Sequence, residues 1–355
     1  MKAVALALIL VCMCSSAWAV YGISVSDLDT PPTPPNPIRV WGRVTSTSPL
    51  KITDGTAEIE LAGISAGLED FLVITGDWDG SVLTVTGSAT AYAGPANTEM
   101  IYIPAGSFLM GNNGSEPDGD PDELPQHSVY LSSYWIGKYE VTRGEYAQFM
   151  ADSGYSNPAY WSADGWTWKV NNNRTEPDYW GPVQDWGSGS FAQTDNHPVV
   201  GVTYYEAEAF CTWTGCHLPT EAQWEKAARW TGTKSLAYPW GDTWFSDRCN
   251  WSDDPVTTGD KTAPVGTYED GVSPNGCYDM AGNMWEWCRD WYDTDYYGTY
   301  PTDGWPDDPQ GPPSGSYRVR RGGCWTYLDD YCRAGSRSYD YPDARCYYYG
   351  IRVAR

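Results

Sequence analysis

The closing segment of the chain, from Arg320 to Arg355, holds the residues with the most chemistry to offer. It contains Cys324, Cys332 and Cys346 among many tyrosines and aspartates. Thiolates bind soft ions such as copper(I) and take part in redox steps. Exposed tyrosines beside aspartates favour ligand binding instead, because tyrosine offers a large contact area at low entropic cost. The segment is therefore either the reactive strip of an oxidising enzyme or a recognition surface.

We call residues 326–349 the C-terminal strip. The strip has no Lys, Glu, Gln, Met or Trp, although Trp and Glu are frequent elsewhere in the chain. Those five cannot appear when the first two bases of an Asn-type codon are randomised, whereas the residue types present can. The strip thus resembles the variable region of proteins that retroelements diversify through adenine-directed mutagenesis. A Tyr-rich acidic surface without that history is the alternative interpretation.

Under either interpretation the strip predicts a binding surface for a protein or a small-molecule ligand. The residues expected to form it are Tyr327, Asp329, Asp330, Tyr331, Tyr339, Asp340, Tyr341, Tyr347, Tyr348 and Tyr349.

Three short helices are expected to help position the strip. Each opens with a capping box, in which a threonine oxygen accepts from an amide of the first turn and a Glu or Gln three residues later reaches back. The boxes begin at Thr142, Thr203 and Thr220, and the helices should end near Met150, Trp213 and Trp230. Beyond Trp230 the sequence predicts mostly loops, with strands expected at 318–321 and 351–353.

The N-terminal part of the chain has a different sequence pattern. Residues 1–19 follow the order of a secretory signal, with a lysine, an apolar run and small residues up to Ala19. Residues 20–37 form a Pro-rich linker. Residues 38–95 alternate apolar and polar residues in short runs, which predicts a small all-β module, either a five-stranded barrel of the OB type or a sandwich. The main domain is expected over 98–355.

The expected export and the net charge limit the classes of partner that the protein can have. The signal predicts a secreted, periplasmic or cell-surface protein, without membrane insertion once the signal is removed. The formal net charge of −24 disfavours nucleic acids and anionic membranes, and it suits cations such as calcium. Ten cysteines minus Cys12 and Cys14 of the signal leave eight, and in an oxidising compartment most should form disulfides whose pairing the sequence leaves open.

A family resemblance rests on phrases that occur in order from about Glu99 to Arg355. They are MIYIPAGSFLMG, YEVTRGEYAQFM, NHPVVGVTYYEAEAFCTW, LPTEAQWEKAAR, YPWGD, YDMAGNMWEWCRDWY, RVRRGGCW and GIRV. This series resembles the sulfatase-modifying-factor family, whose best-known members are the formylglycine-generating enzymes. The resemblance implies an α+β, irregular C-type-lectin-like fold with few short helices. Several retroelement-diversified proteins use this same fold.

The resemblance also implies two structural calcium sites. For the first site the family pattern falls on Asp279, Gly282, Met284 and Glu286, with Asp in place of the usual Asn. Side-chain and carbonyl oxygens of this kind suit a hard ion. For the second site it falls on Asn250, the carbonyl of Trp251 and, across a shorter loop, Asp260. The alternative is that these carboxylates only cap turns.

The family enzymes oxidise a substrate cysteine to formylglycine with two cysteines, five positions apart, that bind copper(I). An ungapped alignment from Gly322 places Cys324 at a family serine, Tyr327 at the first reactive cysteine and Cys332 at the second. One thiolate is then missing, unless Cys324 supplies it. A gapped alignment places Cys332 at a structural disulfide position, whose partner would fall near Ala227.

The sequence therefore leaves three functions open. The leading hypothesis is ligand or protein binding by the strip. The rival is a copper-dependent formylglycine-generating oxidase that uses Cys332 with Cys324. The third is a structural exported module with no ligand of its own.

Overall fold

The computed structural model describes the backbone of five N-terminal strands and most of residues 98–355. Omitted from the latter range are 115, 117–118, 182–183, 186–189, 192, 257–260 and 303. The predicted signal at 1–19, the linker at 20–37 and Asp260 lie outside the described residues. Contacts between Cα atoms divide the chain into two units, 1–92 and 93–355.

The first unit holds five strands: β1 (Ile38–Thr47), β2 (Leu50–Thr53), β3 (Glu58–Ala62), β4 (Phe71–Trp78) and β5 (Val82–Ala93). Their order in the sheet is β3-β2-β1-β4-β5, with antiparallel neighbours and a further parallel pairing between β3 and β5.

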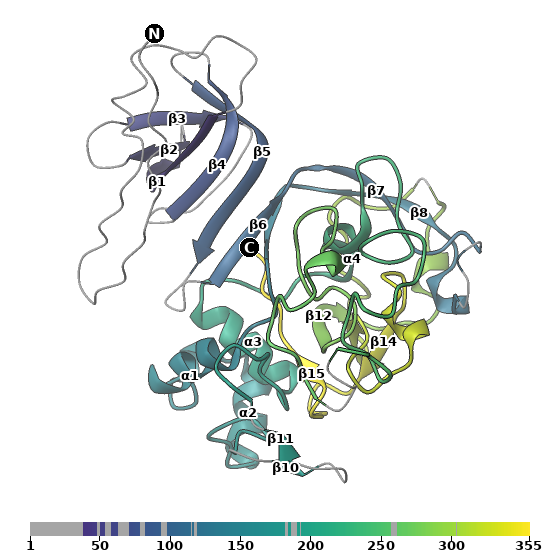
Figure 1. Cartoon of the computed structure of the whole chain (residues 1–355). Helices are drawn as coiled ribbons and strands as arrows, with labels where there is room; N and C mark the ends of the chain where they lie inside the picture. The colour runs from purple at the N-terminus through teal and green to yellow at the C-terminus, as the bar shows by residue number, and fades with distance from the viewer. Residues whose placement is uncertain are drawn as a thin grey trace. The chain divides into compact units, whose positions relative to one another are not determined.

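The second unit mixes short sheets with four described α-helices (Figure 1). The helices are α1 (Arg143–Ala151), α2 (Ala163–Asn171), α3 (Tyr204–Trp213) and α4 (Glu221–Arg229). The pairs are β6 (Thr98–Ile103) with β9 (Tyr134–Gly137), β7 (Gly106–Met110) with β8 (His127–Leu131), and β10 (Gln184–Asp185) with β11 (Ser190–Phe191).

Three helices begin where their capping boxes predicted. Thr142, Thr203 and Thr220 each accept from the amide three residues on, and the Glu or Gln there accepts from the amide of the capping threonine. The predicted ends are confirmed within one residue. Helix α2 was missed because its cap, Ser162, is followed by Gly165 where a capping box needs Glu or Gln.

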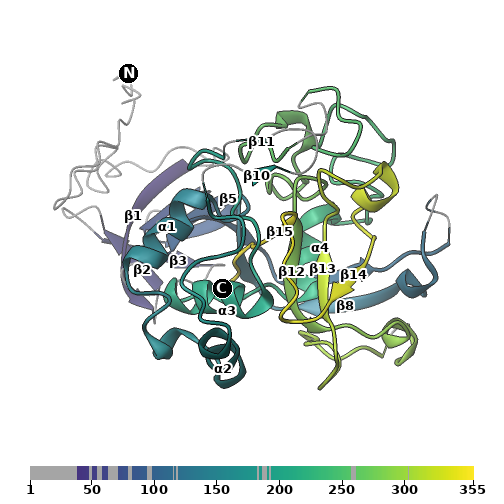
Figure 2. The same ribbon diagram turned by 90° about the horizontal axis from the view of Figure 1, so that it is seen from below.

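A four-stranded sheet carries the end of the chain, in the order β14-β13-β12-β15. Its strands are β12 (Trp285–Trp291), β13 (Arg318–Arg321), β14 (Ser338–Asp340) and β15 (Tyr349–Gly350). In Figure 2 they lie side by side next to α4, which contacts β12 and β13. The prediction of β13 is confirmed, whereas the strand expected at 351–353 is wrong in its bounds, because the ladder to β12 ends at Gly350.

The main core lies between α4, the β7–β8 hairpin and this sheet. Trp224, Ala227 and Ala228 of α4 are fully buried there, with Val319 of β13 and Phe108 of β7. Ala334 of the C-terminal strip also belongs to this core. Among the described helices, none combines the length and the apolar run that a bilayer span requires.

Candidate functional site

The middle of the strip is a buried floor. Residues 332–337 are all buried, and two arginines in this run make two-point ion pairs with distant carboxylates. Arg333 donates to both oxygens of Glu123, at 2.8 and 2.7 Å. Arg337 donates to both oxygens of Glu221, at 2.8 and 3.1 Å. The floor is therefore tied to two segments remote in sequence, and we refer to 332–337 as the strip floor.

The carboxylates under the floor stay ionised. Burial by itself would raise the pKa of Glu123, but the hydrogen bonds and charge of Arg333 hold it below its usual value. Burial by itself would lower the pKa of Arg337. The charge of Glu221 outweighs burial and raises the pKa of that guanidinium well above its usual value. Two fully charged, hydrogen-bonded pairs thus fix the backbone of the strip.

Four tyrosines of the strip form one aromatic group. Tyr327, Tyr331, Tyr347 and Tyr348 are each half-buried, with ring centroids 5.0 Å apart for Tyr327 and Tyr331 and 5.5 Å apart for Tyr327 and Tyr348. Tyr347 and Tyr348 are 5.0 Å apart, and the buried Trp285 of β12 packs against Tyr327. These edge-to-face contacts order the rings before any ligand arrives.

A second group lies around β14. Tyr339 and Tyr341 are 44% and 52% exposed, so they are among the most accessible aromatic side chains of the described residues. Tyr339 stacks on Tyr292 at 4.0 Å and packs against Tyr317 at 4.9 Å, and Tyr317 donates to the hydroxyl of Tyr341 at 3.2 Å. Sequence reasoning missed Tyr317 because it lies outside the Tyr-rich strip.

The aspartates of the strip differ in their surroundings. Asp329 and Asp330 are half-buried and begin a short 3₁₀ turn at 329–332. Asp340 accepts from the amide of Tyr341 at 2.8 Å and also from the hydroxyl of Tyr349.

Tyr349 was predicted to lie on the binding surface, but the structure buries it. Its side chain is 3% exposed and packs against Trp287, because β15 places it in the ladder beside β12. Burial is the main cause that raises the pKa of its phenol, so the group remains a hydrogen-bond donor.

Both candidate catalytic cysteines are inaccessible. Cys324 and Cys332 have no exposed surface. The Cys324 thiol lies 3.5 Å from the hydroxyl of Thr326, and burial raises its pKa to about 12, which keeps it protonated near neutral pH. Cys332 shares a small core cluster with Cys249. The two cysteines therefore do not form an open copper site.

The first predicted calcium site offers one available carboxylate instead of two. Glu286 accepts from Arg352 through both oxygens, at 2.9 and 2.7 Å, and from the indole of Trp224 at 2.6 Å. A guanidinium so placed opposes a second cation at the same carboxylate. Asp279 accepts from the amide of Gly266 at 2.7 Å, and burial raises its pKa to about 6. A calcium ion at Glu286 would lie beside the Arg352 guanidinium.

The other calcium residues lie close to the first set. Asn250 is bridged to Gly282 through their backbones, and the carbonyl of Trp251 accepts from the amide of Asp254 at 3.1 Å. Met284 is fully buried against Trp325. In the described part of the chain, no three His, Cys, Asp or Glu side chains converge as a metal site would require. Calcium binding stays a prediction.

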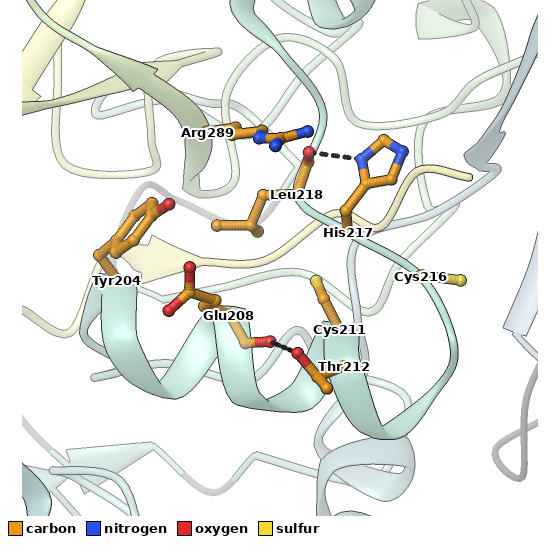
Figure 3. Close-up of a pocket in the computed structure, with 8 residues that line it drawn as sticks. All are labelled: Tyr204, Glu208, Cys211, Thr212, Cys216, His217, Leu218 and Arg289. Atoms are coloured by element: carbon orange, nitrogen blue, oxygen red, sulfur yellow. Dashed lines mark hydrogen bonds between the residues drawn. The ribbon is translucent and has the colours of Figure 1, made fainter. Parts of the chain in front are cut away.

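A separate pocket of about 200 Å³ lies beside α3 (Figure 3). None of the strip residues lines it. Figure 3 shows the thiol of Cys211 directed toward Leu218, whereas the side chain of Cys216 points away from Cys211. Its lining residues are Tyr204, Glu208, Cys211, Thr212, Cys216, His217, Leu218 and Arg289. Glu208 and Arg289 carry opposite charges, so the pocket has no dominant charge to select an ion.

No disulfide joins cysteines within the described residues. The prediction that most of the eight mature cysteines pair is therefore still a prediction. The proximity of Cys249 and Cys332 is the structural feature most relevant to that pairing.

Comparison with known proteins identifies the scaffold. Residues 87–355 match the family model described as the sulfatase-modifying factor enzyme 1-like domain. A formylglycine-generating enzyme of Thermomonospora curvata is 35% identical over 291 residues, which cover 72% of this chain and 92% of that enzyme. A hercynine oxygenase of Mycolicibacterium smegmatis is 34% identical over 275 residues, covering 74% of this chain and 62% of that protein.

Other relatives are much longer than the shared region. The serine/threonine-protein kinase Pkn1 of Chlamydia trachomatis is 35% identical over 261 residues, and the match covers 74% of this chain but 39% of the kinase. The chain thus spans about two fifths of that relative.

Two solved structures are similar over most of their length. PvdO from Pseudomonas aeruginosa has a TM-score of 0.56 and 27% identity, covering 74% of this chain and 95% of PvdO. Treponema denticola variable protein 1 has a TM-score of 0.55 and 26% identity, covering 75% of this chain and 97% of that protein.

Proposed function

The chain belongs to the family of sulfatase-modifying factor enzyme 1-like domains, and we propose that it uses this scaffold to bind a protein or small-molecule ligand through the exposed residues of its C-terminal strip. The two tyrosine groups make the contacts, and the aspartates at 329, 330 and 340 add hydrogen-bond acceptors. Tyr349 is left out because it is buried.

One observation carries this proposal: the strip combines a fixed floor with accessible tyrosines. Arg333 and Arg337 hold the floor through two-point pairs, while Tyr339 and Tyr341 expose 44% and 52% of their surface. Tyrosine is enriched at binding sites because it buries a large area for two rotatable bonds and still offers a hydroxyl. A rigid base beneath such rings lowers the cost of ordering them on binding.

We also propose that the strip is a variable region. Its restricted residue set supports this, and so does the similarity to a protein described as a variable protein. On this proposal, copies of the gene should differ at the exposed and half-buried positions 327–331 and 339–348, and should agree across the floor at 332–337. Sequencing of natural copies, and a search for a reverse transcriptase beside a near-copy of the tail, would test it. Variation that fell equally on floor and surface would contradict it.

The binding proposal is tested with a matched pair of variants. The double variant Tyr339→Ser/Tyr341→Ser removes the two most exposed strip tyrosines, and Tyr300→Ser removes a tyrosine that is 39% exposed outside the strip. The full chain and both variants are immobilised and exposed to material from the natural environment of the protein. Partners retained by the wild type and by Tyr300→Ser should be lost from the double variant. Equal retention by all three would refute binding through this group.

The second candidate function is the copper-dependent oxidase, and it is favoured by the 35% identity over almost all of a formylglycine-generating enzyme. The observations against it are the complete burial of Cys324 and Cys332 and the protonated state of Cys324. Copper(I) titration of the reduced full chain decides between the two. Tight one-to-one binding that is lost in both Cys324→Ser and Cys332→Ser would make the oxidase the better proposal.

Export is part of the proposal, because a displayed surface needs access to external ligands. Expression of the full chain, followed by N-terminal sequencing of the exported product, should find cleavage after Ala19.

A further inference from the structure

We propose that Cys249 and Cys332 form a disulfide bond that fastens the C-terminal strip to the loop around 240–252. This inference stands independently of the proposed binding function, because it rests on the two thiols and their neighbours.

The two thiols are neighbours in one small buried cluster. The Cys332 thiol is one of the groups that act directly on the Cys249 thiol. Cys249 is 2% exposed and Cys332 is fully buried, and both belong to one core cluster with Ala281. A disulfide bond has a sulfur–sulfur distance of about 2.05 Å, which neighbouring thiols reach by moving closer.

The backbone holds each cysteine at this meeting point. On one side, the carbonyl of Asn250 accepts from the amide of Asn283 at 2.8 Å. On the other, Gly323 adopts a φ of +77° and lies so near that an added Cβ would be 2.7 Å from the carbonyl of Tyr331 and 3.3 Å from the amide nitrogen of Cys332. Both neighbouring segments are therefore fixed.

The other cysteines near the strip are less suited. The thiol of Cys324 contacts Thr326, and Cys346 is half-buried on the segment whose carbonyl accepts from Gly201. A metal ion shared by Cys249 and Cys332 would lack further ligands, since the described residues gather no set of three His, Cys, Asp or Glu side chains for one.

The bond forms by thiol–disulfide exchange with a small disulfide such as oxidised glutathione. The two thiols lose two protons and two electrons and gain one sulfur–sulfur bond, and the oxidant is reduced to two thiols. Because both sulfurs are buried in the fold, exchange takes place while the chain is still folding, and the finished bond is shielded from reductants.

The bond would join two aromatic surfaces. The loop carries Trp240, Trp244 and Trp251, which are half-buried and pack on one another, and the amide of Ser252 donates to the carbonyl of Tyr327 at 3.0 Å. It would also remove Cys332 from copper chemistry, because a disulfide sulfur has no thiolate to offer.

Peptide mapping of the wild-type chain is the direct test. The full chain is refolded with reduced and oxidised glutathione, its free thiols are alkylated in denaturant, and it is digested without reduction. The expected product links the peptide of Cys249 to that of Cys332. Alkylation of both residues, or a link from Cys332 to another cysteine, would overturn the proposal.

Thermal unfolding supplies a second readout. Cys249→Ala and Cys332→Ala should lower Tm by similar amounts, and the double variant should fall no further, since one bond is lost in each case. A reductant present during refolding should lower the Tm of the wild type and of the control Cys324→Ala, but should leave the two single variants unchanged. A wild-type Tm that responds to a copper chelator and not to reductant would mean a metal site and would refute the disulfide.

Discussion

Arg352 and Glu286 form a fully buried two-point ion pair, with Nε and Nη2 of the guanidinium 2.9 and 2.7 Å from the two carboxylate oxygens. The same arginine donates to the carbonyls of Gly137 and Tyr278, so it joins β9, the loop before β12 and the end of the chain. Glu286 therefore stabilises the fold by pairing with an internal cation.

This pair predicts that Glu286→Gln is strongly destabilising in a way that does not depend on calcium. Removing one partner of a buried ion pair leaves an uncompensated charge and costs about 3–5 kcal/mol. Urea unfolding should show the same loss with calcium and with EDTA. The control Glu99→Gln breaks a partly exposed pair with Lys138 and should cost at most about 1 kcal/mol. A loss that appears only with calcium would restore Glu286 as a calcium ligand.

A second prediction concerns the arginines of the strip floor. Arg333→Lys keeps the positive charge but cannot donate in parallel to both oxygens of Glu123, so the buried carboxylate loses one of its two charge-assisted hydrogen bonds. We expect a loss of about 1–3 kcal/mol in the free energy of unfolding. Arg345→Lys is the matched control, because Arg345 pairs with Asp178 near the surface. Equal losses in the free energy of unfolding for Arg333→Lys and Arg345→Lys would contradict the conclusion that Arg333 anchors the strip floor.

A third prediction separates packing from exposure within the strip. A Cβ at Gly335 would lie 3.1 Å from Glu123 Oε2 and 3.3 Å from Arg229 Nη1, tighter than ordinary contact. Gly335→Ala should therefore disturb the ion pairs and lower Tm clearly. Tyr341→Ser changes a side chain that is 52% exposed, and it should alter stability by about 0.5 kcal/mol or less. A larger fall in Tm for Tyr341→Ser than for Gly335→Ala would contradict the division of the strip into a buried floor and an exposed surface.

A fourth prediction concerns pH. Burial, aided by the charge of Glu221, raises the pKa of Asp290 to about 7. Because the folded pKa exceeds the unfolded value of ~4, the folded state binds the proton more tightly, and this contribution to stability is lost as the pH rises from ~4 through about 7.

Asp290→Asn should remove this dependence and still accept from the amide of Glu221, as Asp290 does at 2.8 Å. Relative to the variant, the wild type should lose stability between about pH 4 and about pH 7 in urea titrations. Asp253→Asn, at an exposed position, should keep the wild-type slope. An unchanged slope in Asp290→Asn would show that Asp290 is ionised throughout this range.

Some of this architecture was predictable because it is encoded locally. The capping boxes at Thr142, Thr203 and Thr220 fix helix starts through atoms three residues apart. Strand β12 was not predicted, since its residues are buried on both faces and give no alternation for a sequence pattern to reveal.

The candidate site was predictable in composition but not in geometry. The Tyr-rich strip was visible in the sequence, whereas the burial of Tyr349 depends on its pairing with Trp285 of β12. The partner of Cys332 was also hidden, because Cys249 lies far away along the chain and only the tertiary fold brings the sulfurs together. Contacts between remote segments carry no short-range signal.

The division between the strip floor and its exposed tyrosines has a consequence for how the protein can evolve. The buried ion pairs of the strip are made by Arg333 and Arg337, whose partners lie in other parts of the fold. Side chains such as Tyr341 contribute little to that balance. Mutations that explore new ligands can therefore accumulate at the surface with small folding penalties, and a lineage can exchange one partner for another while the scaffold stays under constant purifying selection.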